Sequence, residues 1–279
     1  MTIPKSSFTA VDKAANPQIF VDCMLNQHQT SFSEQYRTQA LAALDLKPGQ
    51  LVLDVGCGLG QDAAKIAAHV GPEGRVIGLD YSQTMIEEAE ALHQTLALPL
   101  SFCQGDTQAL ELDANQFDRC LAIKTFQHLP EPYQALTELV RVTKPGGRIT
   151  IAEPDHDMRM IDSPHRELTR RFLQFRADTL RQGGVAHRLF ALFQEAGLVN
   201  VQVLPVVGIL TDLAECNRIY QFDRGMRAAV AYGVVTEAEA EMWIETMEEA
   251  GKNGRFLSIA TYLITTGEKP LAQNAGSEH

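Results

Sequence analysis

The segment from Leu51 to Val70 constrains the fold of this chain more than any other part of its sequence. It begins with a short apolar run that contains Asp54, and three glycines then alternate at positions 56, 58 and 60. The residues from Ala63 onward have helical composition. A strand, a glycine turn and a helix in this order form a mononucleotide-binding corner, because small residues let a ligand approach the backbone near the helix N-terminus.

A second carboxylate follows at the distance that a nucleotide site requires. Val76 to Asp80 is another short apolar run and ends on an acid about 20 residues beyond the glycines, where a carboxylate can accept hydrogen bonds from both ribose hydroxyls. Asp80 could instead cap a helix that begins near Ser82. The turn has Gln61 where the dinucleotide motif Gly-x-Gly-x-x-Gly needs its third glycine. This spacing disfavours a nicotinamide-dependent dehydrogenase, which stays the third of three interpretations.

Five segments of the chain resemble, in the same order, the motifs of class I methyltransferases that use S-adenosylmethionine. They are residues 52–62 with the glycine turn, 76–80, 100–106 with Gly105 and Asp106, 116–123, and 141–153 with a Lys-Pro-Gly-Gly turn. Proline and glycine end a helix and reverse the chain, so this last turn is mechanically sensible. Together the segments extend over roughly residues 48 to 155, and their joint order is a far more specific signal than the glycine turn alone.

The resemblance implies an α/β fold with a Rossmann-like, mostly parallel sheet of seven strands. The last strand, over residues 255–266, would lie antiparallel between strands five and six. We expect an N-terminal helical lid over residues 1–47 and a methyltransferase domain over residues 48–268. Helical insertions would follow strand five at about 157–184 and strand six at about 213–254, where Thr236 and Glu239 form a predicted capping box. The tail over residues 269–279 is expected to be disordered.

The same resemblance implies S-adenosylmethionine as the cofactor and S-adenosylhomocysteine as its product. Asp80 would bind the ribose, Asp106 the adenine amino group, and the amide of Thr107 a ring nitrogen. Tyr81 and Met85 would pack against the adenine faces or belong to the core. The candidate cofactor-binding residues are Arg37, Asp54, Gly56, Cys57, Gly58, Asp80, Tyr81, Met85, Gly105, Asp106, Thr107 and Lys124.

Arg37, in the expected lid, could pair with the carboxylate of the cofactor through charge-assisted hydrogen bonds. An exposed helix arginine is an equally good interpretation of the same position.

The exit of strand four, over residues 123–130, is where the chemistry of the acceptor often shows in this family. His128 is the candidate catalytic base, because Gln-His-Leu-Pro resembles a segment of ubiquinone and menaquinone biosynthesis methyltransferases, and an imidazole of near-neutral pKa suits proton removal. Packing or capping is the alternative for His128, and positioning alone can suffice, so there need be no base. His156 and Asp155 have weaker support.

The segment over 123–130 also disfavours two classes of methyltransferase. It lacks the Asn-Pro-Pro-Tyr type motif of enzymes that methylate planar amino groups, and it lacks the acid that metal-dependent catechol O-methyltransferases require. Glu153 and Asp155 are therefore predicted to form a polar wall, and no metal is predicted. The five cysteines show no metal-like spacing.

Composition and charge limit the partners. The formal net charge is −11, which argues against a nucleic-acid substrate bound through phosphates. The arginines between Arg166 and Arg181 are predicted to form the solvated face of an amphipathic helix. The first ten residues lack a signal-peptide pattern and no segment suits a membrane span, so a cytoplasmic location is expected. The sequence leaves a homodimer open.

The predicted function is methyl transfer to an O, N or C atom of a small, largely apolar metabolite in an enclosed pocket. Aromatic residues of the lid and insertions suggest such a pocket; they are Phe20, Phe172, Phe175, Tyr220, Phe222, Tyr232 and Trp243. The main alternative is a protein of the same fold, such as a cyclase or decarboxylase, that keeps the cofactor as a scaffold without transferring its methyl group.

Overall fold

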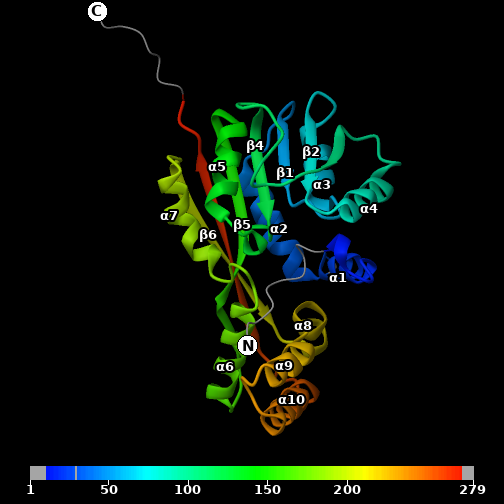
Figure 1. The fold of residues 1–279 in the computed structure, drawn as a ribbon, viewed down its shortest axis with the longest axis vertical. Helices are drawn as coiled ribbons and strands as arrows, with labels where there is room; N and C mark the ends of the chain where they lie inside the picture. Colours follow the sequence, from blue (N-terminus) through cyan, green and yellow to red (C-terminus); the bar gives the residue numbers. More distant parts are fainter. Residues whose placement is uncertain (1–10, 29, 272–279) are drawn as a thin grey trace, which may run out of the picture.

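A computed structural model describes residues 11–28 and 30–271 of the chain. At its centre lies a seven-stranded sheet with the order β3-β2-β1-β4-β5-β7-β6, in which β7 is antiparallel to both of its neighbours (Figure 1). The strands are β1 (Leu51–Val55), β2 (Arg75–Asp80), β3 (Leu100–Gln104), β4 (Phe117–Ile123), β5 (Thr143–Ile161), β6 (Val199–Leu210) and β7 (Ser258–Glu268). The predicted Rossmann-like fold is confirmed, including the antiparallel strand between strands five and six.

Helices cover both faces of the sheet and add a second lobe beyond it. They are α1 (Gln18–His28), α2 (Ser31–Leu44), α3 (Gln61–Val70), α4 (Gln83–His93), α5 (Pro132–Val142), α6 (Arg166–Asp178), α7 (Val185–Glu195), α8 (Leu213–Tyr220), α9 (Phe222–Ala231) and α10 (Glu237–Lys252), with a short 3₁₀ turn, η2 (Phe126–His128). The capping box predicted at the start of α10 is present, because the side chains of Thr236 and Glu239 each accept the other's backbone N–H.

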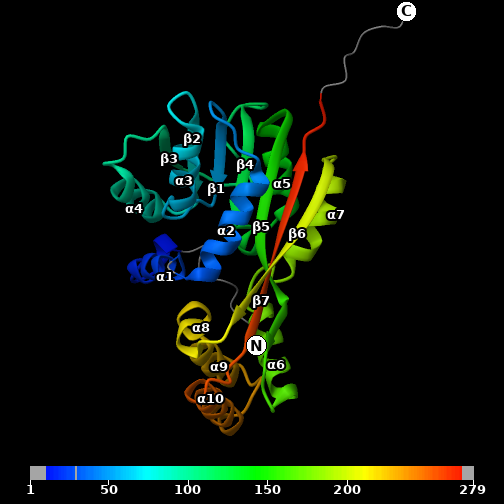
Figure 2. The ribbon, with the colours of Figure 1, turned by 180° about the vertical axis from the view of Figure 1, so that it is seen from behind.

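Alternating side chains of the central strands supply two cores, one on each face of the sheet. In β1, Val52 packs with α2 and α3 on one face, whereas Leu53 packs with α5 and α7 on the other. Figure 2 shows α2 and α3 on the face turned away from α5 and α7. Because helices cover both faces of such a sheet, ligands bind at the ends of its strands.

The strands β5, β6 and β7 continue beyond the other four and carry a cap, by which we mean their protruding ends together with α6, α8, α9 and α10 (Figures 1 and 2). The segment predicted as a helical insertion over 157–184 starts as strand. β5 continues to Ile161, and after an irregularity at residues 155–160 it pairs Met160 and Ile161 with β7. Antiparallel pairing with β7 satisfies this backbone, so it stays extended.

The cap has an aromatic core of its own. Phe172, Phe222 and Trp243 are fully buried and contact one another, and the indole N–H of Trp243 donates to Thr169 Oγ1 at 2.9 Å. In the sequence, these aromatic residues suggest an enclosed ligand pocket. They form the core that holds the cap helices together, and Phe222 and Trp243 also line a cavity between α8 and α10.

The N-terminal helices lie over the glycine turn. Val11 and Val21 pack with Leu59 and Met85 in a small separate core, so α1 rests on the segment that follows β1. The first part of the predicted lid, residues 1–10, lies outside the described residues. At the other end of the chain, the predicted tail was to start at Lys269, but the ammonium of Lys269 donates to the carbonyls of Val140 and Thr143; residues 272–279 lie outside the described residues.

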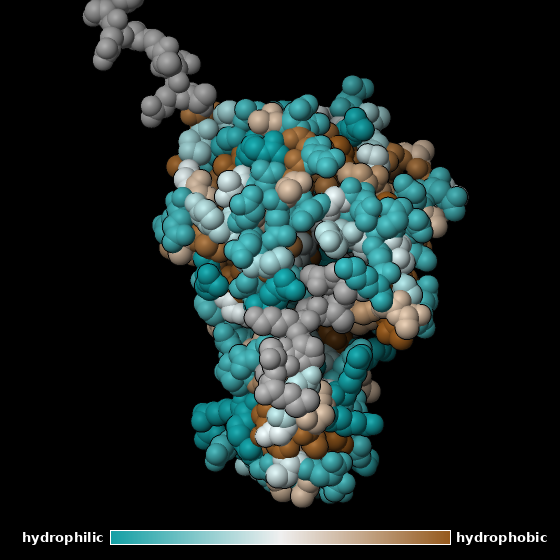
Figure 3. Space-filling view, viewed as in Figure 1, coloured by the Kyte–Doolittle hydropathy of each residue, from teal (hydrophilic) through white to brown (hydrophobic). Residues whose placement is uncertain are grey.

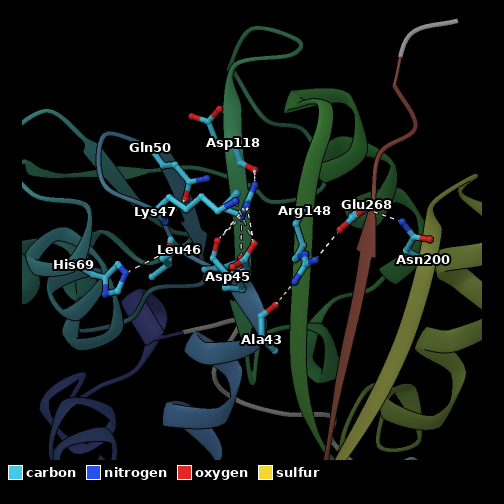
Figure 4. A network of polar contacts seen from close by, with 12 residues as sticks. Ala43, Asp45, Leu46, Lys47, Gln50, His69, Asp118, Arg148, Asn200 and Glu268 are labelled. Carbon is cyan, nitrogen blue, oxygen red and sulfur yellow. Dashed lines mark hydrogen bonds and ion pairs between the residues drawn. The ribbon is translucent and has the colours of Figure 1, made fainter.

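Helix α2 is fixed at its C-terminal end by two arginines of the sheet, of which Figure 4 labels Arg148, beside Ala43. Arg119 of β4 donates to the carbonyls of Leu44 and Asp45, and Arg148 of β5 donates to that of Ala43. These carbonyls are the ones that a helix end leaves without partners. The anchoring places the opposite, N-terminal half of α2 over the carboxyl ends of the strands.

Candidate active site

A cavity of roughly 410 Å³ lies at the carboxyl ends of β1, β2 and β4, beneath α1 and α2. This is the edge where open α/β sheets bind ligands. All but one of the residues that the sequence singled out as cofactor-binding contribute to its wall, and His128 does so as well. The wall includes Arg37, Asp54, Gly56, Cys57, Gly58, Asp80, Tyr81, Met85, Asp106, Thr107, Lys124 and His128.

The exception, Gly105, is not among the lining residues. Its amide donates to the carbonyl of Asp80 at 2.9 Å, and a Cβ there would lie 2.8 Å from Leu79 Cδ1. Gly105 thus allows the chain after β3 to lie close to Asp80. It supports the site without lining the cavity.

The glycine turn brings backbone to the cavity wall. Gly56, Gly58 and Gly60 all have positive φ angles, which side-chain-bearing residues rarely adopt. A Cβ at Gly56 would overlap the side chain of Thr125. The amide of Gly56 donates to the carbonyl of Leu79 at 2.7 Å, which ties the turn to β2.

Asp80 organises the turn around it. One carboxylate oxygen accepts the Gly58 amide at 2.9 Å, and the other accepts the Ser82 amide at 2.9 Å. Helix α4 is capped by Ser82, whose hydroxyl accepts the amide of Met85, so capping is not the main role of Asp80. Burial raises the pKa of Asp80, and the two backbone amides act in the opposite direction. Asp80 lines the cavity, and its carboxylate can accept further hydrogen bonds.

A buried group of charges lies between the turn and α2. Arg37 is only 7% exposed, forms an ion pair with Asp62, and donates to Ser33 Oγ at 3.3 Å. The alternative of an exposed helix arginine is therefore wrong. Asp54 lies near Arg37, yet burial raises its pKa to about 7, with Asp80 adding repulsion and Arg37 opposing both. Within the described ranges, Asp54 Oδ2 and Asp62 Oδ1 are buried acceptors that have no hydrogen-bond partner.

The residues after β2 and β3 form the opposite end of the cavity. Asp106 Oδ1 accepts both the backbone amide of Gln108, at 2.9 Å, and its side-chain amide, at 3.2 Å. Thr107 and Met85 are buried, whereas Tyr81 is 60% exposed at the rim. Tyr81 can therefore move onto a ligand face, while Met85 is fixed by packing with Leu59.

The loop after β4 is held from below by Glu153. Its carboxylate accepts the amides of Thr125 and Phe126, both at 2.6 Å, and that of Gln127 at 3.4 Å. The sequence placed Glu153 on a polar wall, but it is fully buried beneath the loop, and burial raises its pKa to about 8 against these hydrogen bonds. Lys124, with φ of +57°, and His128 reach the cavity because this loop is fixed.

His128 differs from its expected chemistry. Burial, together with the positive charges of Lys124 and Arg181, lowers the pKa of His128 to about 3. The predicted near-neutral pKa is thus wrong, because the imidazole lies in a closed and basic part of the wall. At neutral pH it is an uncharged hydrogen-bonding group.

The two weaker candidates lie beside the cavity wall. His156 Nε2 is 2.8 Å from the side-chain oxygen of Gln127 in η2. Asp155 is paired with His187 Nδ1 at 2.8 Å, and these two with Asp157 place their ligand-type atoms within 4.8 Å of one another. The pairing of Asp155 with His187, and the backbone amide of Asp157, which donates to Asp155 Oδ1 at 3.1 Å, hold these residues together.

Two charged residues of the wall escaped the sequence analysis. Asp62 directly follows the glycine turn, in the first turn of α3, where an acid also favours the helix N-terminus, and this position was the available signal. Arg181 was assigned to the solvated face of a helix, but α6 ends at Asp178 and Arg181 lines the cavity. That assignment was also wrong for Arg176, whose side chain is largely enclosed between α6 and α9.

The described helices include none that is both long and apolar enough to cross a membrane. On the face shown in Figure 3, hydrophilic residues predominate over the broad sheet domain and the narrower cap.

Curated relatives share sequence across much of the chain. An uncharacterized 37.1 kDa protein in transposon TN4556 of Streptomyces fradiae is 32% identical over 243 residues, which cover 86% of this chain and 69% of that protein. The demethylmenaquinone methyltransferase of Bacillus mycoides is 29% identical over 191 residues, which cover 61% of this chain and 78% of the enzyme.

Solved structures share the fold. A methyltransferase structure from Bacillus halodurans has a TM-score of 0.61 at 17% identity and covers 84% of this chain and 98% of its own. The [4+2]-cyclase SpnF has a TM-score of 0.54 at 21% identity and covers 86% and 82%.

A family model described as a methyltransferase domain matches residues 46–192, which is more than half of the chain. This range contains the glycine turn, Asp80, Asp106 and the loop held by Glu153, which all meet at the cavity edge. The chain therefore belongs to the methyltransferase domain family and is a class I S-adenosylmethionine-dependent methyltransferase.

Proposed function

We propose that this cavity binds S-adenosylmethionine and that the chain transfers its methyl group to a small, largely apolar metabolite held between the cavity and the cap. The observation that carries the proposal is the convergence of Asp80, Asp106 and the Arg37–Asp54–Asp62 group on one cavity of roughly 410 Å³. This volume suits a small cofactor.

The polar groups fit the two ends of such a cofactor. Asp106 and the amide of Thr107 would bind the adenine, with Met85 and Tyr81 against its faces, and Asp80 would accept the ribose hydroxyls. At the other end, the free N–H groups of Arg37 suit a carboxylate.

The same end also offers a place for the amino group of the cofactor. Asp54 Oδ2 and Asp62 Oδ1 are buried acceptors that lack partners among the described residues, and an ammonium supplies the donors that they need.

The chain's own residues have to position the acceptor and exclude water. The cofactor's sulfonium makes the methyl group electrophilic, so in-line attack by the acceptor atom forms the new bond while the carbon–sulfur bond breaks. Lys124 and His128 lie on the wall near the cap, and the uncharged imidazole of His128 can hydrogen-bond an acceptor hydroxyl. We assign His128 to positioning.

Calorimetric titration tests the proposal. S-adenosylmethionine and S-adenosylhomocysteine should bind in the micromolar range, and NAD should not bind. Asp80→Ala should weaken cofactor binding by about 1–3 kcal/mol, because a charged acceptor is lost. Glu87→Ala, which removes an exposed acid from α4, the helix that follows Asp80, is the matched control and should bind normally. Failure of the wild-type chain to bind either ligand, or unchanged affinity in Asp80→Ala, would refute the proposed site.

The likeness to SpnF, a [4+2]-cyclase, supports one alternative, in which the cofactor is kept as a scaffold. A metabolite screen with methyl-labelled S-adenosylmethionine separates the two. Label in an organic product supports methyl transfer, whereas a product that forms without label and without S-adenosylhomocysteine supports the alternative.

A further inference from the structure

Two arginines of the cap meet at a single tyrosine. Arg159, on the protruding end of β5, places its guanidinium carbon 3.5 Å from the ring centre of Tyr220. Arg176, on α6, donates from Nη2 to the backbone carbonyl of Tyr220 at 2.8 Å. Their attachment to the same residue brings the two guanidinium groups, which come from different elements, close together.

Neither of these arginines has a carboxylate partner among the residues that the structure describes. Arg159 Nη1 is buried and has no hydrogen-bond partner there. By contrast, the buried Arg37 pairs with Asp62, and the partly buried Arg148 pairs with Glu268. Pairing stabilises partly buried cations, so this arrangement favours the binding of an anion.

The surroundings of Arg176 are shaped to hold its guanidinium. A Cβ on the buried Gly225 of α9 would lie 2.9 Å from both Cδ and Nη1 of Arg176, so the missing side chain gives the arginine its place. Glycine is unfavourable inside a helix. Burial and the positive charges of Arg159 and Arg224 lower the pKa of Arg176 to about 10.

His156 connects this group to the methyl-donor cavity. It is bonded to Gln127, the neighbour of His128 on the cavity wall. Burial and the positive charges of Arg159, Arg176 and Lys124 lower the pKa of His156. Basic side chains therefore extend from the cavity wall at Lys124, past His156, into the cap.

We propose that Arg159 and Arg176 bind an oxyanion, a carboxylate or phosphate group, of the methyl acceptor, whose reacting end lies toward Lys124 and His128. This inference rests on the proposed function and narrows its substrate to a small organic acid. The planar guanidinium groups match the geometry of either oxyanion, and their contacts with Tyr220 hold them in place.

The test compares anion stabilisation in the wild-type chain and in variants, at matched ionic strength. The probes are inorganic phosphate and benzoate, each against chloride, with the melting temperature Tm as the readout. Binding to the folded state should raise Tm of the wild-type chain by about 2–4 °C at probe concentrations tenfold above Kd. The rise should be absent in the double variant Arg159→Gln/Arg176→Gln and retained in Arg170→Met, an exposed arginine of the same helix.

The relative size of the two shifts identifies the group, since a larger rise with benzoate assigns a carboxylate and a larger rise with phosphate assigns a phosphate ester. Equal rises in the wild-type chain and the double variant, or no rise with either probe in the wild-type chain, would overturn the proposal. Arg176→Lys, which keeps the charge, replaces Arg176→Gln if the double variant does not fold.

Titrations of S-adenosylhomocysteine into the same proteins test the cofactor site separately from the oxyanion site. Unchanged affinity in the double variant is expected. If the wild-type chain does not bind S-adenosylhomocysteine but its Tm still rises with the anion, the proposed function is refuted and the oxyanion site is retained.

Discussion

Replacing Asp54 with asparagine should stabilise the folded chain, and increasingly so as the pH rises. Asp54 is buried at the end of β1, and burial raises its pKa from 3.8 to about 7. A carboxyl group whose pKa is raised in the folded state favours folding most below its unfolded pKa, and this contribution is lost as the pH rises toward the folded pKa. Asparagine has no such titration, so the difference between the two proteins isolates it.

The size of the effect follows from the shift. Each pKa unit corresponds to about 1.4 kcal/mol, so a shift of roughly three units makes ionised Asp54 cost about 4 kcal/mol of folding free energy above pH 7. At pH 5 the folded carboxyl is protonated, and the cost is only about 1–2 kcal/mol. The stability of Asp54→Asn relative to the wild-type chain should therefore grow by about 3 kcal/mol between pH 5 and pH 8.

Urea denaturation of both proteins at pH 5, 6, 7 and 8, without cofactor, measures this difference. Glu241→Gln removes the same charge from an exposed position on α10 and controls for net charge; its effect should be nearly flat over this range. A constant offset between Asp54→Asn and the wild-type chain would refute the argument, because it would mean that Asp54 ionises as easily in the folded chain as in the unfolded one.

Three further predictions concern other parts of the molecule. Thr236→Ala should lower the unfolding free energy by about 1 kcal/mol in urea denaturation, through loss of the α10 cap, without changing cofactor affinity in calorimetry. His128→Gln should lower kcat for methyl transfer by less than about tenfold, because an imidazole whose pKa is about 3 is a poor general base, and a general base contributes about 10²–10⁴-fold to the rate. A hundredfold loss of kcat would instead support His128 as the catalytic base. Glu153→Ala leaves the amides of Thr125 and Phe126 without their acceptor and should cost about 1–3 kcal/mol for each, seen as a lower urea midpoint, whereas an unchanged midpoint would show that water replaces the carboxylate.

Much of the fold could be predicted from the sequence because its determinants are local. The glycine turn, the apolar runs that end on Asp80 and near Asp106, and the Lys-Pro-Gly-Gly turn each specify a short piece of backbone, and their order specifies the sheet. The continuation of β5 to Ile161 could not be predicted in this way, because it depends on pairing with β7, which lies about a hundred residues further along the chain.

In the candidate site, the positions of residues could be predicted from the sequence, but the properties of their side chains could not. Positions near the motifs were placed correctly around the cavity, since a strand end fixes where the next residue lies. The properties of those side chains were not predictable, because they depend on neighbours from distant segments. The pKa of His128 is lowered in part by Arg181, and Glu153 became a buried anchor only because the loop after β4 folds over it.

Strand β5 connects the methyl-donor cavity to the proposed oxyanion site of the acceptor and fixes their relative positions. Glu153, Asp155 and Arg159 follow one another on its protruding end, which is paired with β7 on both sides of its irregularity. Glu153 fixes the loop that carries Lys124 and His128 to the donor cavity, and Arg159 contributes to the proposed oxyanion site. Because a paired strand is stiffer than a loop, the distance between donor and acceptor would be set by the sheet, and α1 with the N-terminal half of α2 would only have to cover the donor.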